Sequence, residues 1–200
     1  MDAAATQYNT AIVQSPTVGR ILDAGRFNDI EQVISSGGQG GINANNPISK
    51  IIVLHGEVID GLEITYRKTD GGGTGVPVPH GTSTQTTDTN LQQTPVELKA
   101  TEQIIAITGM HGLSQPDVQF GHRVVRIQFA IYDKATGEMR VTKVFGSRSS
   151  TPFVVTANGN FVSFGGYAIN SLDSVAQAAK KGVEGGIYGL FFDDVEYETV

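Results

Sequence analysis

Short runs of alternating apolar and polar residues dominate the chain after residue 41. Such period-two runs, rich in β-branched side chains and bounded by turn residues, are typical of half-buried strands. The pattern therefore predicts an all-β fold of about ten short strands. The clearest runs are Ile48–Leu54, Gly61–Arg67, Val96–Lys99, Gln103–Thr108, Val124–Tyr132, Arg140–Phe145, Phe153–Thr156, Asn160–Phe164 and Asp194–Tyr197.

Two segments have helical character instead. The stretch Arg26–Ile34 places apolar residues on one face, with Asn28 as a candidate cap and Glu31 three residues later. The alanine-rich stretch 171–182 begins with Ser171 and ends at Gly182, which predicts a small helical insertion near 171–182. We expect residues 1–34 to form a short N-terminal extension and residues 35–200 to form a single domain.

Two connections are readable from turn chemistry. Asp133–Glu138 contains a glycine and separates two strand-like runs, which predicts a hairpin turn. Residues 70–94 contain three consecutive glycines followed by several threonines, which predicts a long polar loop.

Composition narrows the class of protein. The 25 glycines among 200 residues favour many tight turns, and a charged fraction of 17% argues against a coiled coil. The net charge of −6 and the absence of any Lys/Arg run make nucleic acid an unsuitable partner. No apolar stretch approaches a membrane span. The start of the chain shows no signal-peptide pattern, so we expect a cytoplasmic or unconventionally secreted protein.

Catalytic and metal chemistry find little support in the sequence. Cysteine is absent, and the four histidines form no metal-ligand spacing. Asp193 and Asp194 are adjacent on a predicted strand, so their side chains face opposite ways and cannot flank one bond. We therefore expect no enzyme activity, no metal and no cofactor.

A short pattern, glycine followed by three residues and aspartate, occurs at two places that precede strand-like runs. These are Gly56–Asp60 and Gly189–Asp193. A glycine-led turn can direct backbone N–H groups into one small space, and a carboxylate accepts hydroxyl donors. Such a group suits a neutral sugar, with weak affinity per site that gains strength by repetition. Taken alone, either match can equally be an ordinary Asx turn.

The ordered set of motifs resembles the jacalin-related lectins. The glycine loop Gly37–Gly41 comes first, and Ile52–Leu62 follows with its Ile-Asp-Gly-Leu end. The later matches, in the family's order, are Tyr66, Ile104–Gly112, Phe145–Gly146, Val162–Gly166 and the final segment 189–197. Together they cover residues 37–200.

The resemblance implies a β-prism I of three four-stranded Greek keys that binds glycans and assembles as a homodimer. It implies a main site at Gly41, Gly189, Leu190, Phe191 and Asp193. A second site, present in some members, would use Gly56, Glu57, Val58, Asp60, Gly71 and Gly72.

The branch of the family follows from chain continuity. The galactose-preferring branch depends on a cut that frees an amino terminus at the glycine loop, whereas Gly37–Gly41 lies inside a continuous chain. The resemblance therefore implies mannose/glucose-type glycans, with galactose-type glycans as the other option.

Three departures from the family pattern leave another function open. They are residues 1–34, the threonine-rich loop 80–94 and the segment 167–185, which would shade the main site. The alternatives are a β-prism that binds protein partners rather than sugar, and a defence or toxin module that uses the prism for docking.

Overall fold

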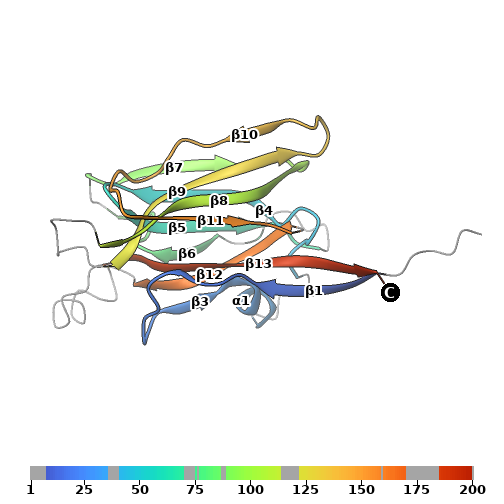
Figure 1. Cartoon of the computed structure of the whole chain (residues 1–200), viewed down its shortest axis with the longest axis horizontal. Helices are drawn as coiled ribbons and strands as arrows, with labels where there is room; N and C mark the ends of the chain where they lie inside the picture. Colours follow the sequence, from blue (N-terminus) through green and yellow to red (C-terminus); the bar gives the residue numbers. More distant parts are fainter. Residues whose placement is uncertain are drawn as a thin grey trace, which may run out of the picture.

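A computed structural model describes residues 8–35, 41–69, 75, 77–86, 89–113, 122–158, 160–169 and 185–199. Thirteen strands and one helix lie within these residues, arranged as three sheets around a common core (Figure 1). The expected all-β prism of three sheets is confirmed, with four strands in two of the sheets and, counting the short β2, five in the third. Among the described residues, no helix has the length and apolar character needed to cross a membrane.

Two of the sheets come from continuous stretches of chain. The first has the strand order β6 (Val78–Gly81), β5 (Ile59–Tyr66), β4 (Ile48–His55), β7 (Gln92–Glu97). The second has the order β10 (Met139–Val141), β9 (His122–Asp133), β8 (Glu102–Leu113), β11 (Thr151–Thr156). In each, three consecutive strands pair in sequence and the fourth returns beside the first, which is the Greek-key arrangement.

The third sheet joins the two ends of the described chain. Its order is β1 (Tyr8–Gln14), β13 (Gly186–Thr199), β12 (Asn160–Ile169), β3 (Arg26–Asn28), and the short β2 (Val18–Gly19) also pairs with β13. Taken in the order β12, β13, β1, β3, these strands have the spatial arrangement of a Greek key. In this sheet β13 and β1, the last and first strands of the chain, are neighbours by pairing. The N-terminal segment expected as an extension thus supplies both edges of this sheet in the structure.

The short helix α1 (Asp29–Ser35) follows β3 directly. The Asn28 side chain accepts a hydrogen bond from the Ile30 N–H at 3.2 Å and donates one to Glu31 at 3.1 Å. The expected cap is therefore confirmed, although Arg26–Asn28 is strand rather than helix. The helix expected near 171–182 lies outside the described residues.

Two connections show where turn chemistry was informative and where it was not. The Asp133–Glu138 hairpin is confirmed, with β10 pairing to β9 and the Asp133 N–H bonded to the Glu138 carbonyl oxygen at 2.9 Å. The prediction of one polar loop over 70–94 was wrong, because β6 lies inside it and pairs with β5. The sequence Val78-Pro79-His80-Gly81 gave no strand signal, since proline disfavours strands except at sheet edges.

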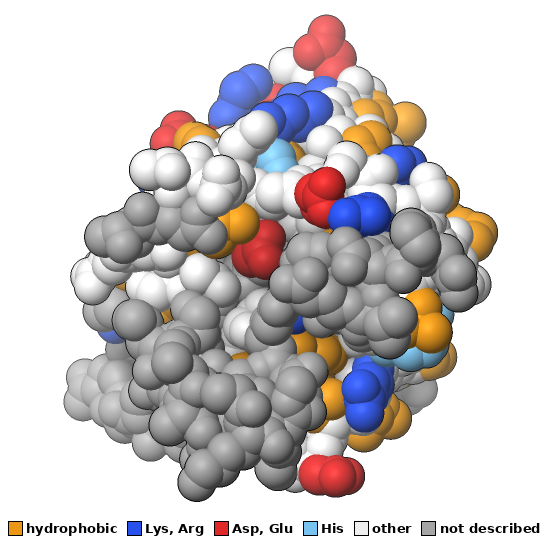
Figure 2. All heavy atoms as spheres, turned by 90° about the vertical axis from the view of Figure 1, so that its left-hand side faces the viewer, with side chains coloured by type: hydrophobic (Ala, Val, Ile, Leu, Met, Phe, Trp, Pro, Cys, Tyr) orange, Lys and Arg blue, Asp and Glu red, His pale blue; other side chains and the backbone are white. Residues whose placement is uncertain are grey.

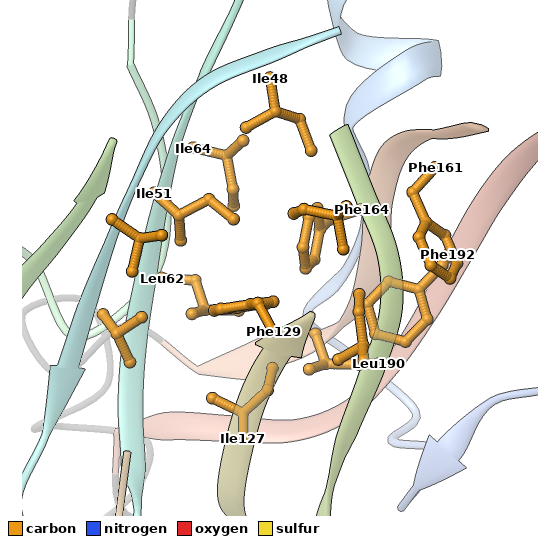
Figure 3. Packing of buried hydrophobic residues seen from close by; sticks show 14 of the residues in the cluster. Ile48, Ile51, Leu62, Ile64, Ile127, Phe129, Phe161, Phe164, Leu190 and Phe192 are labelled. Carbon is orange, nitrogen blue, oxygen red and sulfur yellow. The ribbon is translucent and has the colours of Figure 1, made fainter. Parts of the chain in front are cut away.

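The core lies between the three sheets and is built from their inward-facing aliphatic and aromatic side chains (Figure 3). Phe129 from β9 packs edge-on to Phe164 from β12, with ring centroids 6.4 Å apart. Phe164 in turn packs edge-on to Phe192 from β13 at 5.1 Å. Ile51, Leu62 and Ile64 close the core from the first sheet, and all of these residues are buried. The three sheets therefore share one core.

Candidate functional site

One end of the prism gathers the turn Gly56–Asp60 and the start of β13. The Cα pairing of His55 with Ile59 makes Gly56–Val58 the turn that links β4 to β5. Asp60 is then the second residue of β5, and its side chain is 15% exposed. The predicted glycine-led bend at this position is thus present. It places the Asp60 carboxylate at the protein surface, partly exposed to solvent.

Asp60 is held through both its side chain and its backbone. Its Oδ1 atom lies 4.0 Å from Nη1 of Arg123, a residue of β9 that is itself 1% exposed. Its carbonyl oxygen accepts a hydrogen bond from the Thr82 N–H at 2.8 Å. Both oxygens of a carboxylate can accept hydrogen bonds from hydroxyl donors.

Glu57 and Val58 have different environments in the same turn. Val58 is buried, at 1% exposure, so its side chain belongs to the core. The Glu57 carboxylate accepts a hydrogen bond from Arg148 Nε at 2.9 Å, and its carbonyl oxygen accepts one from the Ser147 N–H at 3.0 Å. These contacts attach the turn to the loop that precedes β11, so the backbone of the turn is fixed from outside the hairpin.

A loop that the sequence did not single out lies at the same end. Gly19 and Gly25, both with positive φ, bound a connection between β2 and β3. The Arg20 N–H donates to the Tyr188 carbonyl oxygen at 2.8 Å, and the Ala168 N–H donates to the Gly25 carbonyl oxygen at 2.9 Å. The sequence offered one signal for this loop, which was the six-residue spacing of Gly19 and Gly25. Both glycines lie in the segment that was expected to be an extension.

The other predicted bend is not a bend. Gly189–Asp193 runs through the middle of β13 and pairs with β12, so the prediction of a glycine-led turn there was wrong. Leu190 is 0% exposed, and Phe191 and Asp193 are each 2% exposed. A turn-forming pattern inside a long paired strand takes the conformation of the sheet, because the ladder satisfies its backbone groups.

Asp193 points into a polar cluster rather than toward solvent. Its carboxylate accepts a hydrogen bond from the buried Ser163 hydroxyl. Burial raises the pKa of Asp193 above its ordinary value, and hydrogen bonds from Ser163 and Gln14 partly oppose the rise. In this arrangement the carboxylate is directed into the interior of the sheet.

The remaining predicted site residues are Gly41, Gly189, Gly71 and Gly72. The Gly41 carbonyl oxygen accepts from the Thr69 N–H at 2.9 Å, and Gly41 lines a cavity of about 240 Å³ with Tyr66 and Lys68. Gly189 instead packs against Thr17 and Arg20. The structure therefore does not bring Gly41 to Gly189. Gly71 and Gly72 lie outside the described residues.

Figure 2 shows the left-hand side of Figure 1, which is the end at which β13 begins. Acidic and basic side chains lie side by side there. Three polar groups that contact one another at this end come from different sheets or lie next to one. Asp60 belongs to β5, Arg123 belongs to β9, and Gly185 directly precedes β13. Such an arrangement can accept hydrogen bonds from a hydroxyl-rich molecule at the Asp60 carboxylate.

Comparison with known proteins points to one family. A model of the jacalin-like lectin domain matches residues 33–177. This match begins close to the boundary expected at residue 35, and it ends before Gly189–Asp193. No curated protein matches the chain in sequence.

Solved structures extend the similarity to nearly the whole chain. A mannose-specific jacalin-related lectin from Morus nigra, solved with mannose, has a TM-score of 0.60 at 14% identity and covers 96% of this chain and 97% of its own. A Malaysian banana lectin has a TM-score of 0.60 at 14% identity, covering 95% of this chain and 100% of its own. A mannose-binding lectin from Champedak has a TM-score of 0.61 at 16% identity, covering 96% and 97%.

These TM-scores over nearly the whole chain establish a shared fold, and the family-model match covers more than half of the residues. The sequence motifs, the three Greek-key sheets and the family-model match agree. The chain belongs to the jacalin-like lectin domain family.

Proposed function

We propose that this protein is a carbohydrate-binding lectin for mannose/glucose-type glycans and that Asp60 is its principal hydrogen-bond acceptor. The observation that carries the proposal is the partly exposed Asp60 carboxylate, held beside Arg123 at the end of the prism. The family membership supports the same function, and the mannose-specific lectins with a similar fold support the sugar class.

The chemistry of the site suits a neutral sugar. Each sugar hydroxyl donates one hydrogen bond, and two neighbouring hydroxyls can donate to the two oxygens of a carboxylate. The turn backbone at Glu57 is fixed by Ser147 and Arg148, so little ordering is required on binding. A shallow site of this kind binds single sugars in the millimolar range, about 4 kcal/mol. A homodimer would raise the effective affinity through multivalency, and it forms part of the proposal.

The test combines a glycan array with calorimetric titration of methyl α-mannoside. Asp60→Asn keeps the shape of the side chain and removes its charge, so we expect binding to weaken by about tenfold or more, as for a lost charged hydrogen bond. Asp133→Asn is the matched control. Asp133 is also a carboxylate beside a cation, Lys99 at 3.4 Å, but it lies at the opposite end of β9 from Arg123.

Three results would contradict the proposal. Unchanged affinity of Asp60→Asn would show that Asp60 is not the acceptor. Loss of binding in Asp193→Asn alone would show that the sugar site lies at the Gly189–Asp193 segment instead. A wild-type protein that binds no sugar on the array would favour a prism that recognises protein partners.

A further inference from the structure

Arg123 is a buried cation at the end of the prism that carries Asp60. Its guanidinium Nη1 lies 4.0 Å from Asp60 Oδ1 and donates a hydrogen bond to the Gly185 carbonyl oxygen at 2.9 Å. Its guanidinium carbon lies 5.1 Å from the centre of the Tyr188 ring. Burying a charge is costly unless partners of this kind compensate it, so these contacts account for an arginine that is 1% exposed.

The contacts of Arg123 cross all three sheets. Arg123 belongs to β9, Asp60 to β5 and Tyr188 to β13. At Gly186, a Cβ atom would lie 2.9 Å from Arg123 Nη1, so the backbone at the start of β13 passes directly against the guanidinium. The position of this one side chain is therefore fixed by separate elements.

We propose that Arg123 is a positioning residue of the sugar site: it holds the Asp60 carboxylate in one orientation relative to the start of β13. This inference rests on the function proposed above. At 1% exposure Arg123 does not touch the sugar, and it acts through Asp60, whose side chain is 15% exposed. A carboxylate held in place before binding loses less conformational freedom when the sugar arrives, which strengthens binding.

The test is a double-mutant cycle in sugar affinity, on variants shown to be folded by circular dichroism. We expect Arg123→Met to weaken binding of methyl α-mannoside about tenfold, a change typical of coupled neighbours. We expect Arg123→Lys to lie between the wild type and Arg123→Met, since it keeps the charge and loses the planar fork. In the Asp60→Asn background, Arg123→Met should have no further effect, because the carboxylate that it positions is gone.

The matched control is Arg140→Met. Arg140 also pairs with a buried carboxylate, Glu102, with Nε to Oε1 at 2.8 Å, but this pair lies at the start of β8, away from Asp60. Sugar affinity should be unchanged in this variant. A general loss of stability would affect both arginine variants, whereas positioning affects Arg123→Met alone.

The outcomes separate this inference from the proposed function. Wild-type affinity in Arg123→Met, with binding lost in Asp60→Asn, overturns the inference and leaves the proposed function standing. Additive losses in the double variant also overturn it. Unchanged affinity in Asp60→Asn contradicts the proposed function instead.

Two further measurements cover failures of folding and of binding. If Arg123→Met does not fold, Arg123→Lys takes its place. Wild-type affinity in Arg123→Lys then overturns the inference, because lysine lacks the planar guanidinium that is proposed to orient the Asp60 carboxylate. If the wild type binds no sugar, the role in binding is overturned together with the proposed function. A cycle of Arg123→Lys and Asp60→Asn in unfolding free energy then decides whether Arg123 still holds Asp60.

Discussion

At the scale of single residues, Asp60 and Asp193 share one sequence pattern and have opposite environments. Asp60 is the second residue of a strand that follows a hairpin turn and is partly exposed, whereas Asp193 lies within β13 and is 2% exposed. The pattern predicted the bend at Gly56–Asp60 because a hairpin is a local structure. It failed at Gly189–Asp193 because β12 and the N-terminal strands pair with that segment, and their positions are not local information.

The buried carboxylate of Asp193 gives the fold a pH dependence. Its pKa is raised above the ordinary value of 3.8, mainly by burial, so in the interval above 3.8 the folded state binds more protons than the unfolded state. The contribution of Asp193 to the free energy of unfolding therefore falls as pH rises through this interval and is constant above it.

We predict that Asp193→Asn raises the free energy of unfolding at pH 7 by about 1 kcal/mol, because it removes a buried charge and keeps an acceptor for Ser163. Urea denaturation from pH 3 to pH 8 measures this. The gain should vanish toward pH 3. A variant that is less stable than the wild type at pH 7 would show that the ionised carboxylate stabilises the sheet.

At the scale of elements, β3 and α1 are attached to the rest of the prism by a buried polar cluster of Asp29, Tyr66 and His80, with the partly buried Phe27 beside it. Asp29 is 0% exposed, and its Oδ1 lies 2.6 Å from His80 Nε2 on β6. Its other carboxylate oxygen accepts from the Tyr66 hydroxyl, which in turn accepts from the Phe164 N–H at 3.1 Å. Phe27 stacks on the His80 ring with centroids 3.6 Å apart. Burial raises the pKa of Tyr66 well above 10.0, so it remains the donor.

We predict that Asp29→Ala lowers the free energy of unfolding by about 3 kcal/mol, because the buried Tyr66 hydroxyl and the buried His80 ring lose the carboxylate beside them. Hydrogen exchange of residues 26–32 should accelerate more than exchange of β8 and β9. Glu31→Gln is the control, because its ion pair with Arg26 is exposed and should contribute little. Equal acceleration across all three sheets would show that this cluster stabilises the whole fold rather than the attachment of one segment.

At the scale of the whole molecule, both ends of the described chain are needed to complete the third Greek key. β12 and β13 come from the C-terminal part, and β1 and β3 come from the N-terminal part. β1 pairs with β13 over seven residues, from Tyr8 with Thr199 to Gln14 with Asp193. A sheet closed in this way depends on pairing between the most distant parts of the sequence.

We predict that a chain lacking residues 1–28 loses cooperative unfolding, since β12 and β13 lose their edge partners, and Val18 and Phe27 no longer pack against the core. Thermal denaturation followed by circular dichroism provides the measurement. If residues 1–34 were only an extension, the shortened chain would unfold at the same temperature as the full chain.

The shared core leads to a second prediction at this scale. Phe164→Ala should cost about 3–5 kcal/mol, because a buried aromatic ring between two other rings leaves a cavity. Val154→Ala, at a position 67% exposed, should change stability little. Tyrosine fluorescence and circular dichroism should report one coincident transition; separate transitions would mean that the sheets fold independently.

The sequence by itself determined the features that depend on neighbouring residues. These include the strands from β4 to β12 other than β6, the Asn28 cap, the Asp133–Glu138 hairpin and the bend at Gly56–Asp60, and the ordered motifs were sufficient to indicate the family. Only the tertiary structure decided the roles of the N-terminal strands, of β6 and of Asp193. Their conformations come from pairing and burial against distant segments, and Arg123 gained its partners in the same way. Local sequence patterns do not predict such long-range contacts, because the free energy that stabilises them arises only when the three sheets pack together.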